Sequence, residues 1–179
     1  MRHKINPLSH NFLADLGQIY YFNREYGEAE QLCLKALEIY PDFQFAHDYL
    51  YDIYLKTGEY DKATEEFIKA DKINHTFANE SAKSKELLEA NHVKLRKIYR
   101  EDGIKKFVED LLVKSQDSNV PYANATLYAL LGENEKALDN LEKAYEGKAF
   151  LSAFVKADPI FDHLRDEPPY REILRKMNL

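Results

Sequence analysis

A pattern of apolar and aromatic residues near the N-terminus recurs 34 positions later, and this repeat constrains the fold more than any other feature. The run Leu16-Gly17-Gln18-Ile19-Tyr20 aligns with Leu50-Tyr51-Asp52-Ile53-Tyr54. The same shift aligns four more pairs: Tyr26 with Tyr60, Ala29 with Ala63, Cys33 with Phe67 and Ala36 with Ala70. A fixed period of this length indicates one supersecondary unit that is used repeatedly.

Two later segments keep the internal spacing of this unit but not the period. They carry the residues Leu95, Tyr99, Gly103, Val108 and Leu112, and then Tyr128, Gly132, Ala137, Leu141 and Ala144. Between the matching tyrosines 20, 54, 99 and 128 the intervals are 34, 45 and 29 residues. We therefore expect an insertion before the third unit and a shortened link before the fourth.

The spacing within a unit is that of two antiparallel helices. Leu16 and Tyr20 lie four apart on one helical face, and Ala29, Cys33 and Ala36 follow at steps of four and three on a second. Alanine at positions 29 and 63 permits close helix approach, and Gly17 and Ala125 are expected to make room for a neighbouring helix.

Glycines and prolines mark the ends of these helices. Gly58, Gly103 and Gly132 occupy the same turn position, where a residue with positive φ ends a helix at little cost. The first unit departs from this pattern because Arg24 stands there. Pro41 and Pro121 fall where one helix should end and another begin.

Composition is consistent with a helical chain. Six glycines and six prolines in 179 residues are too few for a disordered linker or a many-turned β-sandwich. The single cysteine, Cys33, excludes an intrachain disulfide and a multi-cysteine zinc site, and its repeat position predicts a buried apolar role. Apolar runs are short, so we expect a soluble chain without membrane insertion.

The motif Leu16-Gly17, Tyr20, Tyr26, Ala29, Ala36 and Pro41 resembles the tetratricopeptide repeat. The resemblance implies one all-α domain over residues 1–179, a superhelix of stacked antiparallel helix pairs with three to four repeats. Expected repeats cover residues 10–43, 44–77, 89–117 and 118–146, with an inserted segment at 78–88 and a capping tail at 147–179. Arg96 and Asn124 depart from the family pattern.

The C-terminal run Asp158-Pro159-Ile160-Phe161-Asp162-His163-Leu164-Arg165 is similar to the end of tetratricopeptide domains of bacterial winged-helix transcriptional regulators, nucleotide cyclases and kinases. A stacked array must cover its last apolar face. We therefore expect this tail to be a cap, with apolar contacts from three groups of residues: Phe150, Leu151, Phe154 and Val155; Ile160, Phe161 and Leu164; and Ile173, Leu174 and Met177.

Catalysis is not expected. The six histidines form no His-x-x-x-His pair, so the spacing typical of a histidine metal site is absent. The sequence has no glycine-rich phosphate-binding loop. Asp48 and Asp52 are expected to form a solvated helix face rather than a cation site. Lys94, Lys97 and Arg100 form a basic stripe in a chain of net charge -6, but without a basic domain or stacking platform no nucleic-acid binding is predicted. No metal or cofactor is predicted.

The resemblance implies a peptide or protein partner in a concave groove lined by the first helix of each repeat. Groove positions carried over from the family are Gln18, Tyr21, Phe22, Phe45, Asp48, Asp52, Lys56, Lys97, Arg100, Tyr122 and Thr126. The aromatic residues Tyr21, Phe22 and Phe45 are expected to anchor the partner or to pack between repeats. Acidic and small residues replace the family's basic carboxylate clamp, so a C-terminal-carboxylate ligand is not expected.

The function predicted from the sequence is a non-catalytic interaction or sensory module. The alternative is an effector-sensing or dimerisation domain of a bacterial transcriptional regulator, with its DNA-binding part outside this chain. The resemblance implies a bacterial cytoplasmic protein, or a periplasmic one if it is the sensory end of a membrane-anchored regulator. Partner identity and homodimer formation are left open.

Overall fold

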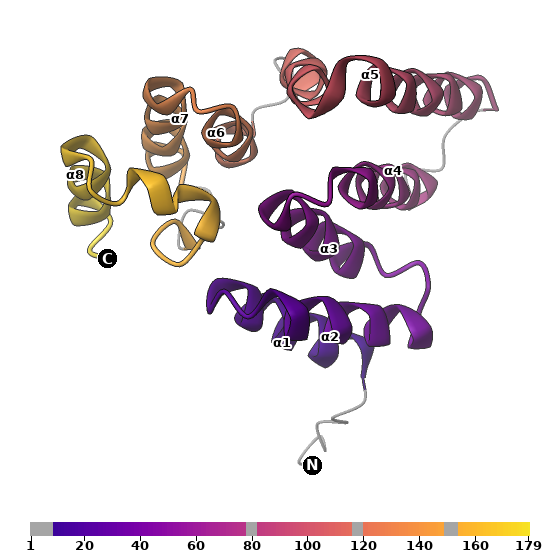
Figure 1. The fold of residues 1–179 in the computed structure, drawn as a ribbon, viewed down its shortest axis with the longest axis horizontal. Coiled ribbons are helices and arrows are strands. Elements are labelled where there is room, and N and C mark those ends of the chain that lie inside the picture. Colours follow the sequence, from indigo (N-terminus) through magenta and orange to yellow (C-terminus); the bar gives the residue numbers. More distant parts are fainter. Residues whose placement is uncertain (1–8, 78–81, 116–119, 149–153) are drawn as a thin grey trace. The chain divides into compact units, whose positions relative to one another are not determined.

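The computed structural model describes residues 9–77, 82–115, 120–148 and 154–179, and this part of the chain is helical without strands. The elements in order are α1 (His10–Phe22), α2 (Tyr26–Ile39), α3 (Gln44–Thr57), α4 (Tyr60–Phe77), α5 (Ala82–Ser115), α6 (Pro121–Leu130), α7 (Asn134–Glu146), the 3-10 helix η2 (Pro159–Leu164) and α8 (Pro168–Lys176) (Figure 1). They form two compact units, Met1–Lys97 and Ile98–Leu179. The predicted all-α class is confirmed.

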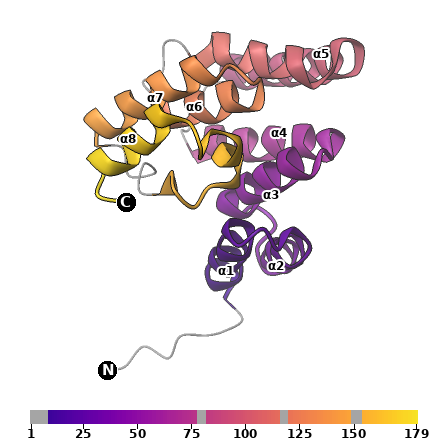
Figure 2. The same ribbon diagram turned by 60° about the vertical axis from the view of Figure 1, so that its left-hand side comes forward.

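Consecutive helices pack as pairs in the first unit. Helix α1 lies against α2 and α3 lies against α4, while α2 and α1 also contact α3 (Figure 2). The small residues of the repeat meet at these contacts, since Ala29, Cys33, Ala36 and Ala63 have no exposed surface. The predicted helix pairing is therefore confirmed.

The turn glycines adopt the backbone conformation expected of them. Gly58, Gly103 and Gly132 have φ values of 79°, 77° and 73°. Arg24, at the same position of the first unit, also has a positive φ of 65°. The turn geometry is thus kept where the sequence departs from glycine, at a conformational cost of about 1–2 kcal/mol for a residue with a Cβ.

Gly17 allows α1 and α2 to approach closely. A Cβ placed on Gly17 would lie 2.7 Å from the Cys33 Sγ atom and 3.1 Å from the Ala29 carbonyl oxygen. The sulfur belongs to a side chain without exposed surface, and the oxygen belongs to the backbone. Neither atom can yield without moving α2, so the predicted packing role of Gly17 is confirmed.

We expect Gly17→Ala to destabilise the first unit by about 1–3 kcal/mol, the cost of overpacking a close contact. In an open helix position the same change stabilises by about 0.5–1 kcal/mol. Urea unfolding followed by circular dichroism measures the difference. Gly27→Ala is the matched control, because a Cβ there meets nothing within 4 Å; equal midpoints for the two variants would contradict the close approach.

Helix α5 is broken at Gly103, whose ψ of -174° is not helical. The break separates two helical segments, and Tyr99 packs against Phe107 across it with ring centroids 6.5 Å apart. The segment expected as an insertion, 78–88, is helical from residue 82 onward as the first turns of α5. The part of α5 before Gly103 contacts α4, since Arg96 donates two hydrogen bonds of 2.8 Å to the Glu65 carboxylate.

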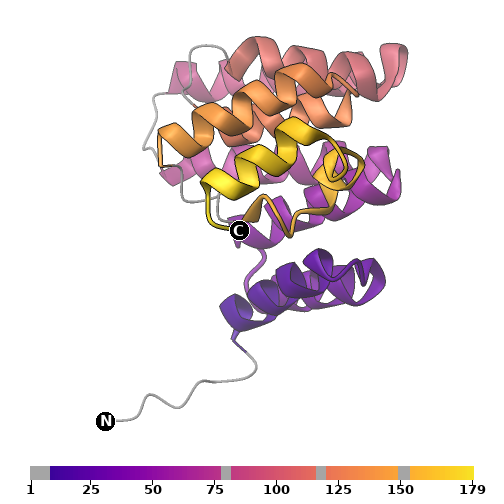
Figure 3. The same cartoon turned by 90° about the vertical axis from the view of Figure 1, so that its left-hand side faces the viewer.

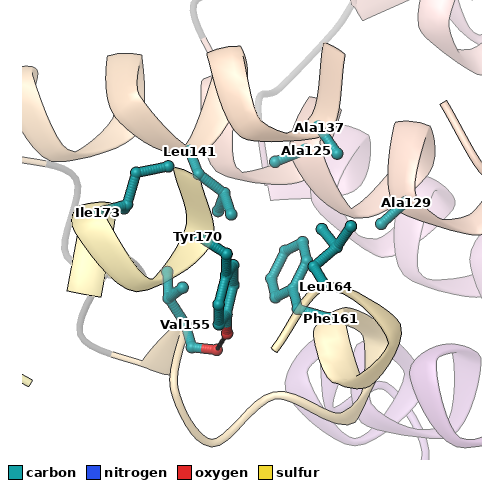
Figure 4. Close-up of a cluster of buried hydrophobic side chains, with 9 residues drawn as sticks. All are labelled: Ala125, Ala129, Ala137, Leu141, Val155, Phe161, Leu164, Tyr170 and Ile173. Carbon is teal, nitrogen blue, oxygen red and sulfur yellow. Dashed lines mark hydrogen bonds between the residues drawn. The ribbon is translucent and has the colours of Figure 1, made fainter. Parts of the chain in front are cut away.

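The predicted capping tail is confirmed in the second unit. Helix α8 lies against α7 and η2 lies against α6 (Figure 3). Between them is a core made of small and apolar side chains from all four elements and from Val155: Ala125, Ala129, Ala137, Leu141, Val155, Phe161, Leu164, Tyr170 and Ile173 (Figure 4). Ile160, Leu174 and Met177 pack at its edge. Phe150 and Leu151, expected in the same cap, lie outside the described residues.

Polar groups fix this tail to the helices that it covers. Asp158 accepts a hydrogen bond from the Ile160 amide at 3.0 Å, which caps η2, and another from the Tyr122 hydroxyl at 2.8 Å. The Tyr170 hydroxyl donates to the Val155 carbonyl at 2.7 Å inside the core (Figure 4). The Asp-Pro pair of the tail therefore begins the 3-10 helix and ties it to α6.

Candidate functional site

Helix α3 presents four of the predicted partner-binding residues. Phe45, Asp48, Asp52 and Lys56 follow at steps of three, four and four, which places them along one face of the helix. Phe45 is 57% exposed, Asp52 is exposed, and Asp48 and Lys56 are half-buried. This face therefore offers an aromatic ring, two carboxylates and one amine in a row.

Asp48 carries its carboxylate in a partly desolvated position. Burial raises its pKa to about 6, against the opposing effects of a hydrogen bond from Gln44 and the charge of His47. The Gln44 amide donates to the Asp48 Oδ2 atom at 3.4 Å. The charge of Asp48 in turn raises the pKa values of Tyr49 and Tyr51 on the same helix. Asp48 thus costs folding free energy when it is ionised.

We expect Asp48→Asn to stabilise the protein by about 1–3 kcal/mol at pH 7.5. Because the folded-state pKa is raised, the carboxyl group favours folding below about pH 4, and this contribution is lost as the pH rises through about 6. Urea unfolding of the wild type and the variant at pH 4 and pH 7.5 measures the effect. The exposed neighbour is the control, because Asp52→Asn should change stability little. A stability difference between Asp48→Asn and the wild type that is the same at pH 4 and pH 7.5 would contradict the burial.

Tyr49 lies where α1 and α3 meet. Burial raises its pKa to about 12, and the charges of Asp15, Asp48 and Asp52 add to the shift. Asp15 is an exposed residue of α1, which packs against α3. The charges of carboxylates from two helices therefore act on one tyrosine, and we call Asp15, Asp48, Tyr49 and Asp52 the acidic seam.

Next to Phe45 the structure gathers further rings. Phe45 contacts Phe43 with centroids 5.7 Å apart, Phe43 contacts His10 at 4.7 Å, and His10 contacts Tyr40 at 5.2 Å. Tyr40 is 40% exposed. We call His10, Tyr40, Phe43 and Phe45 the aromatic cluster. It joins the start of α1, the link between α2 and α3, and the start of α3.

The other residues predicted on α1 lie away from this cluster. Tyr21 is 5% exposed and packs against Phe22 and Tyr26 at 5.6 and 5.9 Å. These rings sit at the end of α1, about 16–18 Å along the helix from His10. Gln18 is half-buried between the two ends. Tyr21 therefore serves repeat packing, whereas Phe45 is open to a partner.

The remaining predicted residues lie on α5 and α6. Lys97, in the first unit, and Arg100, in the second, are exposed on α5. On α6, the Tyr122 hydroxyl bonds to Asp158 and its ring meets Phe161 at 6.0 Å, so this residue holds the cap. The Thr126 hydroxyl donates to the Ala123 carbonyl of its own helix at 2.8 Å.

A buried polar network below the aromatic cluster was not foreseen from the sequence. His47 Nδ1 lies 2.5 Å from Glu66 Oε2, and His47 Nε2 lies 2.9 Å from the Pro41 carbonyl oxygen. Lys69 donates to the other Glu66 oxygen at 2.7 Å. Burial raises the pKa of Glu66, but the hydrogen bonds from His47 and Lys69 outweigh it, and the net pKa is lowered. The network joins α4 to the link before α3.

Features of catalytic chemistry are sparse in the part of the chain that the structure describes. Within these residues, no three His, Cys, Asp or Glu side chains converge as metal ligands would. Cys33 is fully buried, and burial raises the pKa of its thiol to about 12, so it is held as a thiol. Among the described helices, none combines the length and the apolar character needed to cross a membrane.

Comparison with known families identifies the repeats of the first unit. Residues 10–43 and residues 52–76 each match the tetratricopeptide repeat. The first match covers α1 and α2, and the second covers the end of α3 and most of α4. A search of curated proteins finds no match to the chain. These two stretches are thus similar to the tetratricopeptide repeat, a unit that generally mediates protein–protein interaction.

Proposed function

We propose that this protein is a non-catalytic interaction module that holds a segment of a partner protein against the surface formed by α1 and α3. The observation that carries this proposal is the position of Asp48. A half-buried carboxylate with a pKa raised by burial lowers stability, yet it stands in a row with exposed Phe45 and Asp52. Side chains that reduce stability and remain reachable are typical of binding sites.

The exposed rings of the aromatic cluster are a second argument for a binding surface on α1 and α3. Phe45 and Tyr40 expose 57% and 40% of their area, although both rings contact other rings. Partly exposed aromatic side chains on a fixed scaffold supply contact area at low entropic cost, and such residues dominate the energy of many interfaces. Helix α3 thus combines an apolar anchor, Phe45, with charged groups that set the orientation of the partner segment.

A peptide library displayed on phage tests the proposal without assuming a partner. Peptides selected on the wild-type protein should lose binding to Phe45→Ala and to Asp52→Lys. They should keep binding to Asp139→Lys, which makes the same charge change at an exposed position of α7. Circular dichroism verifies that each variant is folded. Selection of no peptide, or equal binding to all four proteins, would contradict the proposal.

A further inference from the structure

We infer that the partner segment is a cationic peptide that lies along α3 and carries two arginine or lysine residues separated by one other residue. This inference rests on the proposed function and specifies the chemistry of its partner. It is carried by the charge of the first helices, the exposed rings beside them and the spacing of the two carboxylates.

The charge of the surface is one-sided. Helices α1 and α3 together contain three aspartates, Asp15, Asp48 and Asp52, against a single lysine, Lys56, in the last turn of α3. Glu38 and Asp42, both exposed, flank Tyr40 of the aromatic cluster in the chain. A surface lined by one sign of charge attracts segments of the opposite sign and disfavours acidic ones.

Asp48 supplies a specific contact for a cation. Its carboxylate is desolvated by burial, and Gln44 gives it a hydrogen bond at the long distance of 3.4 Å. A guanidinium or ammonium group at this position would replace the lost hydration with a charge-assisted hydrogen bond, roughly twice as strong as a neutral one. The residue that weakens the free protein would then strengthen the complex.

The aromatic cluster suits the same ligand. A cation within about 6 Å of an aromatic face is attracted by the ring, and arginine stacks on such faces most often. The first unit already contains this contact, because Lys62 lies 4.8 Å from the centre of the Tyr54 ring. At Phe45 the ring is 57% exposed, so a side chain from outside can occupy its face.

The spacing of the carboxylates selects the pattern of the peptide. Asp48 and Asp52 are four residues apart on α3, which places them about 6 Å apart along the helix axis. In an extended peptide, side chains on one face recur every second residue at about 6.6–6.8 Å. Two basic residues of the peptide that are separated by one residue therefore match the two carboxylates. The peptide residue that lies next to this pair, toward the N-terminal end of α3, would reach Phe45.

Fluorescence anisotropy with three labelled peptides of equal length tests this inference. The peptides carry Arg-Ala-Arg, Arg-Arg-Ala or Glu-Ala-Glu in the same neutral background. We expect Arg-Ala-Arg to bind most tightly and Glu-Ala-Glu not to bind. The double variant Asp48→Asn/Asp52→Asn should weaken Arg-Ala-Arg binding by about tenfold or more, the effect of losing charge-assisted contacts.

The matched control is Glu135→Gln/Asp139→Asn, which removes two exposed carboxylates with the same four-residue spacing from α7. Its affinity should equal that of the wild type. Circular dichroism verifies that both double variants are folded, so that weaker binding is not caused by unfolding. Equal loss in both double variants, or equal affinity for all three peptides, would overturn the inference. Library peptides that need Phe45 and Asp52 but carry no basic pair would overturn it while leaving the proposed function intact.

Discussion

Replacing Phe161 with alanine should remove about 3–5 kcal/mol from the stability of the second unit, the usual cost of deleting a fully buried aromatic ring. The side chain has no exposed surface, and its ring centroid lies 6.0 Å from that of Tyr122 on α6. The Tyr170 ring of α8 lies 6.4 Å away, beside Phe161 in the core (Figure 4). A cavity here would separate the tail from the helices that it covers. Since whole domains are stable by only about 5–15 kcal/mol, much of the tail should detach.

Hydrogen exchange of the amides of α6, α7 and α8, together with urea unfolding, measures this loss. Ile160→Ala is the matched control, because the neighbouring side chain packs only at the edge of the same core. A shift for Phe161→Ala no larger than that for Ile160→Ala would contradict the central position of the ring.

Removal of the tail is a stronger form of the same test. A chain that ends at residue 157 should expose Ala125, Ala129, Ala137 and Leu141 and aggregate in size-exclusion chromatography, whereas a chain that lacks only residues 178–179 should not aggregate.

The features that could be predicted from the sequence are those that repeat. Alanines 29, 63 and 137 hold one position of the repeat, and all three are fully buried. The glycines at 58, 103 and 132 likewise share one left-handed turn. Each of these roles is set within one helix pair, so it recurs in most of the pairs and shows as a period in the sequence. The helix pairing and the covering tail followed from it.

The polar pairs could not be predicted, because they occur once and join distant residues. His47 and Glu66 are 19 residues apart, and Arg96 and Glu65 are 31 apart. Arg96 stands where the family usually has a small residue, and only the fold shows that a carboxylate on α4 receives it. Charged residues follow no period, so their partners depend on how the helices are placed against one another.

The candidate surface was predicted in part for the same reason. Phe45, Asp48 and Asp52 were carried over from family positions, and their helical spacing places them on one face of α3. The ring partners of Phe45 could not be predicted in this way, since His10 and Phe43 come from another helix and from a link. Tyr21 and Tyr122 were predicted as partner-binding residues from family positions, but in the structure both side chains make packing contacts. A position in the repeat does not by itself tell whether a side chain is packed or exposed.

The buried pair of His47 and Glu66 should be the most sensitive polar contact of the first unit. Glu66→Ala is expected to cost about 3–5 kcal/mol, because removing one partner of a buried ion pair leaves the other desolvated. The side chains of His47 and Glu66 are 6% and 10% exposed. The pair also holds the Pro41 carbonyl, so its loss should loosen the link that carries the aromatic cluster.

The adjacent residue provides the control for this prediction. Glu65, on the same helix as Glu66, pairs with Arg96 of α5, but the side chains of Glu65 and Arg96 are 44% and 29% exposed, so Glu65→Ala should cost no more than about 1 kcal/mol. Urea unfolding at pH 7 compares the two variants, and equal losses would contradict the difference in burial.

The pH dependence of stability gives a second test of the pair of His47 and Glu66. Because the pKa of Glu66 is lowered in the folded state, its contribution is full above the ordinary value of 4.5 and is lost as the pH falls through the lowered one. The wild type should therefore lose more stability than Glu66→Gln on acidification below about pH 4.5, because glutamine does not titrate.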